Sequence, residues 1–282
     1  MDALLDTGKL LPFLYVTYLA MEYLEHKLEG KTDRLMRKAG RFGPVYGGLL
    51  GVVPQCGFSA AAASLYAGRV VSVGTLLAVF LSTSDEMLPI MLSRQTPAGE
   101  VVQILAIKAG IGIAAGFLVD AMFRRKGAAR PSGETDGIEA FCGDAHCHCA
   151  HGNLFLAALR HTVSIALFIA AFSLIINLAL YWVGEEAIAA LLLRAPAISV
   201  LLTALVGLIP NCAASVAITT LYLDGFLSFG AMMAGLLVGA GVGLLVLFRV
   251  NHHGRENIKI LGLLYGIGVL CGGLLDLMQV TV

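Results

Sequence analysis

A short pattern occurs twice in this sequence, and each copy interrupts an apolar stretch. The first copy is GVVPQCGFS at residues 51–59 and the second is GLIPNCAAS at residues 207–215, so both read Gly-x-x-Pro-Gln/Asn-Cys-x-x-Ser. Proline removes a backbone donor and ends an α-helix, and it pushes the preceding residue out of helical geometry. Each copy therefore predicts a broken helix rather than a continuous one.

The composition places these breaks in a membrane. The chain has 282 residues, of which 58% are hydrophobic and 13% are charged, whereas a soluble domain carries about 25% charged residues. We expect an all-α polytopic membrane protein whose surroundings are the lipid bilayer. The formal net charge is +0, which gives no basic field for a nucleic-acid partner. Glu22 and Glu25 interrupt the first apolar run, so no cleaved signal peptide is predicted.

Eight apolar elements are expected, two of them interrupted by the motifs. Their residue ranges are 10–24, 42–67, 70–92, 101–123, 154–183, 196–223, 226–248 and 258–278. Most have about the 20 apolar residues that a membrane-spanning helix needs.

The second half of the chain repeats the first at an offset of 156 residues. The offset pairs the two motifs and then continues without a gap to Asp120 and Asp276. Chance similarity between apolar segments would not keep Pro, Cys, Tyr and Asp in one register over this length. We predict one transmembrane repeat at residues 1–123, a connecting loop at residues 124–152 and a second transmembrane repeat at residues 153–282.

Basic residues predict how the repeats are oriented. Residues 27–41, 124–130 and 249–259 hold six, four and three Lys or Arg residues, and cytoplasmic loops are basic. The three segments share one side only if residues 42–67 enter the bilayer and return as a hairpin with limbs of roughly 15 Å. Each repeat then has three full spans plus one re-entrant helical hairpin. Because three is odd, the two repeats are inverted, and their hairpin tips are expected to meet near the midplane.

The first motif and the segment after it resemble a known family. PQCGFS at residues 54–59, followed by GTLLAVFLSTSDE at residues 74–86, is similar to the ten-transmembrane heavy-metal exporter family, also described as arsenic-permease-like or as manganese transporters. The resemblance extends over nearly the whole chain and includes the second motif. It implies efflux of a metal or metalloid without selecting one ion.

The hairpin tips supply the candidate substrate ligands: Gln55, Cys56, Ser59, Asn211, Cys212 and Ser215. Thiolates suit zinc, Cu(I) and other thiophilic ions, and two symmetry-related cysteines could share one ion. The alternative is that the cysteines are small buried hydrophobes and that the amides and hydroxyls satisfy the broken backbone.

Three ionisable residues are expected inside the bilayer and are candidates for proton coupling. Asp85 and Glu86 lie in the middle of an apolar element, where acids are costly and suggest a function; one of them could also bind the substrate. The alternative is a capping box, with Thr83 at the N-cap and Glu86 at N3. Lys108 could neutralise one of the acids or extend to an interface.

Two further features are the Cys- and His-rich connecting loop and the glycines within the apolar elements. The connecting loop holds six possible metal ligands within ten residues: Cys142, His146, Cys147, His148, Cys149 and His151. Their mixture suits zinc, nickel, cobalt or copper, so we expect a cytoplasmic metal collector, the alternative being a plain connector. Glycines at 110, 112, 116, 266, 268 and 272 permit close helix contacts, either within the chain or in a homo-oligomer.

Together these features predict a secondary transporter in the plasma (inner) membrane. It would export a heavy-metal cation or metalloid by alternating access, coupled to protons, with no cofactor other than the transported ion. The alternative is a channel or carrier for a small organic anion or oxyanion. A membrane enzyme is disfavoured because no expected span has a histidine at its centre.

Overall fold

The chain is entirely α-helical in the part that the structure describes. In this computed structural model that part comprises residues 42–53, 56–84, 87–125, 199–210 and 212–279, together with helical positions 15, 16, 19, 159, 163, 167, 171, 174 and 178. The predicted all-α class is confirmed at this level.

The helices form two series. The first half comprises α3 (Gly43–Gly51), α4 (Cys56–Ala67), α5 (Val73–Ser82), α6 (Met87–Ser93) and α7 (Ala98–Arg125). The second half comprises α11 (Ser199–Gly207), α12 (Cys212–Leu223), α13 (Phe229–Val238), α14 (Val242–Val250) and α15 (Gly254–Leu277). The helices α11, α12, α13 and α15 begin 156 residues after α3, α4, α5 and α7. The helix boundaries therefore keep the register of the sequence repeat.

Four segments are long and apolar enough to cross a membrane. They are Val73–Ser93, Ala98–Phe123, Phe229–Val250 and Gly254–Leu277, and they match four of the predicted apolar elements with shifts of a few residues at their ends. The protein is therefore a multi-pass membrane protein.

Two of these segments are broken near their middle. A break after Ser82 was only one of the alternatives left open, through the capping box at Thr83 and Glu86. The sequence predicted no break in the element at residues 226–248, and there the structure differs. There α13 ends at Val238, and α14 begins after Gly241, whose φ of 52° and ψ of −137° suit glycine. The sequence Gly-Ala-Gly at residues 239–241 interrupts the helix without any polar side chain.

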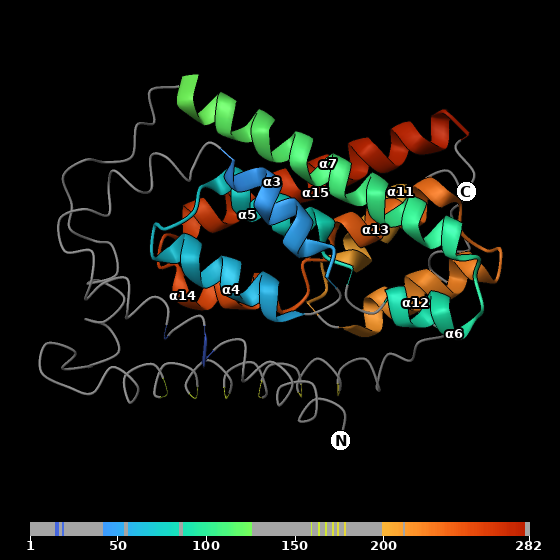
Figure 1. Ribbon diagram of the computed structural model, residues 1–282, viewed down its shortest axis with the longest axis horizontal. Helices are drawn as coiled ribbons and strands as arrows, with labels where there is room; N and C mark the ends of the chain where they lie inside the picture. The colour runs from blue at the N-terminus through green and yellow to red at the C-terminus, as the bar shows by residue number, and fades with distance from the viewer. Residues whose placement is uncertain are drawn as a thin grey trace, which may run out of the picture.

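The two broken segments form the buried centre of the described bundle, and α7 and α15 lie outside them. In Figure 1, α7 and α15 lie along one side of the molecule. Helix α7 packs on α5 and α3, while α15 packs on α13 and α11. The middle of the bundle is therefore built from half-helices.

The two halves exchange contacts through their short helices. Helix α4 packs against α14 of the second half, whereas α12 packs against α6 of the first. Figure 1 shows the α4–α14 pair at one end of the long axis and the α12–α6 pair at the other. Neither half could bury these faces alone.

Glycines permit the close packing of the outer helices on the inner ones. A Cβ at Gly112 or Gly116 would meet α5, and a Cβ at Gly268 or Gly272 would meet α13. By contrast, a Cβ at Gly110 would meet nothing within 4 Å, and the same holds at its repeat equivalent, residue 266. Of the two alternatives for these glycine faces, contact within the chain accounts for the four buried positions.

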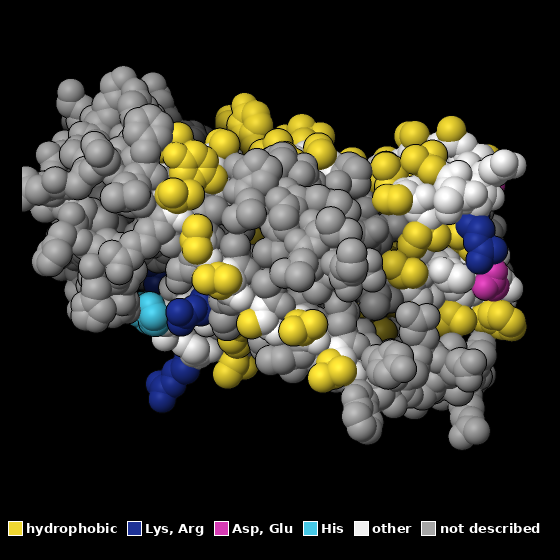
Figure 2. Space-filling view, turned by 90° about the horizontal axis from the view of Figure 1, so that it is seen from below, with side chains coloured by type: hydrophobic (Ala, Val, Ile, Leu, Met, Phe, Trp, Pro, Cys, Tyr) yellow, Lys and Arg dark blue, Asp and Glu magenta, His cyan; other side chains and the backbone are white. Residues whose placement is uncertain are grey.

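Charged side chains gather at the ends of the molecule. Figure 2 shows Lys, Arg, His and acidic side chains near the two ends of one face, with described hydrophobic side chains between them. Large apolar side chains such as Leu118 and Leu270 are exposed on α7 and α15. This distribution suits an apolar belt in contact with lipid.

Candidate functional site

Hydroxyl groups close the broken end of α5. Ser82 Oγ donates to Ala78 O at 2.5 Å, and Thr83 Oγ1 donates to Val79 O at 2.7 Å. Ser84 Oγ donates to Ser82 O at 3.1 Å. Ser82 and Thr83 bond back to carbonyls one turn earlier, and Val79 O also accepts from Thr83 N. Ser82 O, in contrast, is beyond the reach of the amides of α5 and needs another donor. The three hydroxyls stabilise a helix end in the interior.

At the second break, a backbone carbonyl near the end of α13 loses its usual helical hydrogen-bond donor. In a continuous helix, the amide of Ala240 would donate to Leu236 O. Here it donates instead to Val238 O at 2.7 Å. The Leu236 carbonyl is thereby left for another donor.

Lys108 is that donor, and it joins the ends of two half-helices. Its Nζ donates to Leu236 O at 2.9 Å and to Thr83 O at 2.5 Å. The side chain is 1% exposed. It extends from α7 into the interior, so the alternative in which it reaches a membrane interface is wrong. The ammonium lies where the partial negative charges at the C-terminal ends of α5 and α13 converge.

A small polar cavity lies beside this ammonium. Its lining comes from both halves: Thr83, Ser84, Met87, Lys108, Ser215, Leu236 and Gly239. The hydroxyl-bearing residues Thr83, Ser84 and Ser215 share it with the ammonium. Such a lining can bind an oxygen-rich or anionic group directly, and a cation through its oxygens.

The repeat-equivalent position is packed differently. Leu264 is the counterpart of Lys108 in the repeat and is fully buried. On that side, a Cβ at Gly243 would meet both Ser59 and the ring of Phe80. Ser59 is therefore packed between α4 and α14, while its counterpart Ser215 lines the cavity.

The first glycine of each motif lets a short helix approach its broken neighbour. A Cβ at Gly51 would overlap Ser82 Oγ and crowd Val79 O. A Cβ at Gly207 would overlap the Gly235 carbonyl. The last residues of α3 and α11, Gly51 and Gly207, therefore lie directly against the last turns of α5 and α13.

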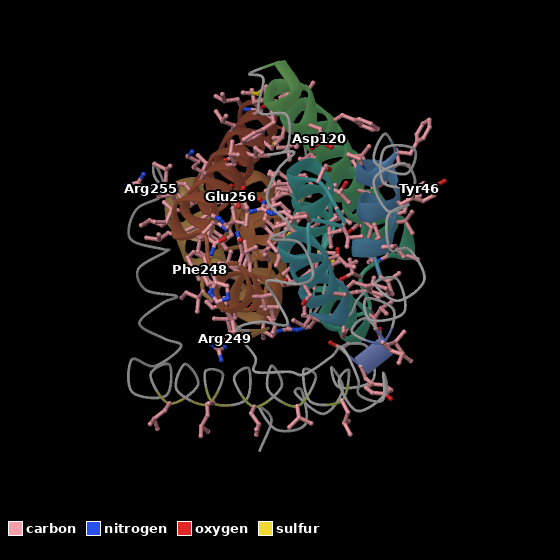
Figure 3. All side chains as sticks on the ribbon, turned by 90° about the vertical axis from the view of Figure 1, so that its left-hand side faces the viewer. Tyr46, Asp120, Phe248, Arg249, Arg255 and Glu256 are labelled. Carbon is pink, nitrogen blue, oxygen red and sulfur yellow. The ribbon has the colours of Figure 1, made fainter. Side chains whose placement is uncertain are left out.

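Ion pairs link the halves at both ends of the molecule. At one end, the Arg69 guanidinium donates to both Glu256 carboxylate oxygens at 3.1 Å. Burial, the largest single effect, lowers the pKa of the Arg69 guanidinium, but hydrogen bonding and charge attraction to Glu256, with a contribution from Tyr66, together outweigh it and raise that pKa. Figure 3 looks onto this end, with Glu256 within the bundle and Arg255 projecting outward.

The opposite end carries a weaker pair. Arg94 Nη1 lies 3.4 Å from Asp224 Oδ1, and both side chains are more than a third exposed. Arg94 follows α6 and Asp224 follows α12, so this contact again joins the first half to the second.

A comparison with family models decides the relationship of this chain to known proteins. A model described as "Putative, 10TM heavy-metal exporter" matches residues 8–163, more than half of the chain. The chain belongs to this exporter family. No curated protein and no solved structure matched it.

The predicted ligands of this exporter-family chain lie only partly within the described structure. Of the tip residues, the structure describes the side chains of Ser59 and Ser215, which occupy different surroundings. Gln55, Asn211, Asp85, Glu86 and the side chains of Cys56 and Cys212 lie outside the described residues, as do the six Cys and His residues of the connecting loop. Within the described ranges, no group of three or more His, Cys, Asp or Glu residues could hold a metal ion.

Sequence reasoning missed two features of this exporter-family chain. The polar cavity depends on Gly239, which looks like one glycine among many in an apolar segment. The role of Arg69 could have been suspected from its charge in a short connection, but its partner lies 187 residues away. Asp120, which the repeat pairs with Asp276, caps the start of α5: its carboxylate accepts from Ser72 Oγ at 2.7 Å and from Gly74 N at 2.9 Å.

Proposed function

We propose that the protein is a secondary transporter of the plasma membrane that exports a heavy-metal cation or a metalloid. The match to the heavy-metal exporter family carries this conclusion. The apolar spans and the polar cavity between two broken helices support it, because transporters bind their cargo where helices are interrupted.

The proposed topology consists of two inverted repeats, each with three full spans and one re-entrant hairpin. Two sets of contacts support it. Arg69 and Glu256 meet at one end, and Arg94 and Asp224 meet at the other. Because α5 follows Arg69 and α14 precedes Glu256 in the chain, the broken segments α5–α6 and α13–α14 would run in opposite directions.

The proposed hairpins are α3–α4 and α11–α12. Their helices have 9 and 12 residues in each half, which corresponds to roughly 14 and 18 Å, about half of the hydrocarbon thickness. Helix α3 packs on α5, and α11 packs on α13. These contacts support hairpins whose tips end beside the broken helices instead of crossing the bilayer.

In the proposed cycle, the cytoplasmic loop at residues 124–152 collects the ion through its cysteines and histidines. The ion then passes to a midplane site formed by the tip residues Gln55, Cys56, Ser59, Asn211, Cys212 and Ser215. Rocking of one repeat against the other would alternate access. Asp85, Glu86 and Lys108 would carry the counter-transported proton, and no catalytic reaction is assigned.

One observation favours a second candidate, a carrier for a small oxyanion or organic anion. The cavity brings an ammonium together with the hydroxyls of Thr83, Ser84 and Ser215. Hydroxyl and ammonium groups are donors to anions. This candidate uses the same scaffold and differs only in the charge of the cargo.

A sensitivity panel separates these candidates. Cells lacking the protein, cells expressing it and cells expressing Cys56→Ala are grown with thiophilic metals, manganese, arsenite and oxyanions, and intracellular content is measured. Cys271→Ala is the matched control, because Cys271 is a half-buried residue on α15 that is not among the proposed ligands. Metal efflux predicts lower accumulation of one ion, lost in Cys56→Ala and kept in Cys271→Ala. If no metal or metalloid content changes on expression, the proposed export is wrong, and a change confined to oxyanions supports the second candidate.

A further inference from the structure

We propose that the ends of α5 and α13 form a site for a monovalent cation, and that the Lys108 ammonium is its resident cation. The site would make a free alkali cation unnecessary at the centre of the bundle. It lies beside the proposed substrate pathway, but the inference does not depend on which substrate is exported.

The first argument is the origin of the two acceptors. Thr83 O follows the last residue of α5, and Leu236 O lies in the last turn of α13. Both helices end in the interior, so both carbonyls lie at the negative ends of helix dipoles. Two such ends from different halves are directed at one nitrogen atom.

The second argument is the type of ligand. Among the described residues, two backbone carbonyls accept hydrogen bonds from the ammonium, and the cavity beside it adds hydroxyls. Neutral oxygens of this kind replace the hydration shell of monovalent ions, and half-helix ends coordinate such ions in transporters. The described oxygens therefore supply part of the shell that a monovalent cation needs, with Lys108 supplying the charge from a side chain.

The third argument is the repeat. Leu264 occupies the equivalent place on α15 and is fully buried, as Lys108 is. One half of the duplicated scaffold therefore supplies a tethered cation, and the other half supplies an isobutyl group. This makes Leu264 a natural control, since its truncation removes a buried side chain of the same scaffold without removing a charge.

The test removes the Lys108 ammonium by substitution and then asks whether a small free cation can replace it. The full chain carrying Lys108→Ala is purified and its thermal unfolding is followed while methylammonium, Na⁺ or K⁺ is added at constant ionic strength. N-methylglucamine, a bulky organic cation, serves as the control. Wild type, Lys108→Met, whose apolar side chain fills the space, and Leu264→Ala are measured in parallel.

We expect Lys108→Ala to unfold at a lower temperature than wild type, and a small cation to raise that temperature with saturation. Wild type, Lys108→Met and Leu264→Ala should respond to that cation no more than they do to N-methylglucamine. If Lys108→Ala does not fold, Lys108→Ser takes its place, since it also leaves the space open.

A folded Lys108→Ala or Lys108→Ser variant that gains no more from any small cation than Leu264→Ala does would overturn the proposal. Lys108 would then be only a hydrogen-bond donor to two helix ends. Because the readout is unfolding, absence of metal export in cells leaves this result unaffected, and the two proposals can fail separately.

Discussion

The bidentate pair between Arg69 and Glu256 should stabilise the contact between the two halves measurably. Two charges about 4 Å apart interact by roughly 4 kcal/mol at an effective dielectric constant of about 20. The side chains are 41% and 35% exposed, so solvent screening reduces this value strongly. We expect a coupling free energy of about 1 kcal/mol, the upper part of the range for exposed pairs.

A double-mutant cycle measures that coupling. The variants are Arg69→Gln, Glu256→Gln and the double variant, and the readout is the free energy of unfolding in mixed micelles. Glutamine is preferred to glycine at position 69, because Arg69 has a φ of 58° and glycine would also relieve backbone strain. Added salt should reduce the coupling, since both side chains are partly exposed.

The pair at the opposite end is the matched control. Arg94 and Asp224 are 3.4 Å apart and 53% and 38% exposed, so their coupling should stay below about 0.5 kcal/mol. If the Arg69–Glu256 coupling is no larger than the Arg94–Asp224 coupling, the difference in geometry does not govern the contact between the halves, and the reasoning fails.

Three further substitutions test the packing of the half-helices, each by the free energy of unfolding. Gly207→Val would push a side chain into the Gly235 carbonyl and should cost at least about 1–3 kcal/mol, whereas a Cβ at Gly266 would meet no atom within 4 Å, so Gly266→Val should change stability little. Asp120→Ala removes two acceptor contacts at the start of α5 and should cost about 1–2 kcal/mol; a value near zero would contradict the capping role. Gly241→Ala forces a φ of 52° and ψ of −137° on a residue with a Cβ and should cost about 1–3 kcal/mol, and an unchanged stability would mean that the second break relaxes freely.

Much of the helical order could be predicted because it depends on local chemistry. The prolines of the motifs and the polar residues after Ser82 end helices through their own backbone and side chains. Low charge and long apolar runs then identified spans within a few residues of the observed ones. The break at residues 239–241 was missed because glycine permits an unusual backbone conformation without requiring it.

The site could be predicted only in part, because its decisive contacts join backbone atoms far apart in the chain. Lys108 stood out as a charge in an apolar segment. Its acceptor Leu236 O lies 128 residues away and belongs to a leucine whose side chain suggests nothing polar. The carbonyl is available only because the helix breaks just after it, so missing the break meant missing the partner.

The two halves of the chain agree at some equivalent positions and differ at others, and both kinds of position are informative. The duplicated helices keep their register, and the capping serines Ser72 and Ser228 occupy equivalent places at the start of α5 and α13. At the centre, the counterparts diverge into Lys108 and Leu264. A duplicated fold brings two pairs of helix ends together, but one ammonium satisfies acceptors from both halves at once. Divergence between Lys108 and Leu264 therefore gives two similar halves one polar centre, as the proposed central pathway requires.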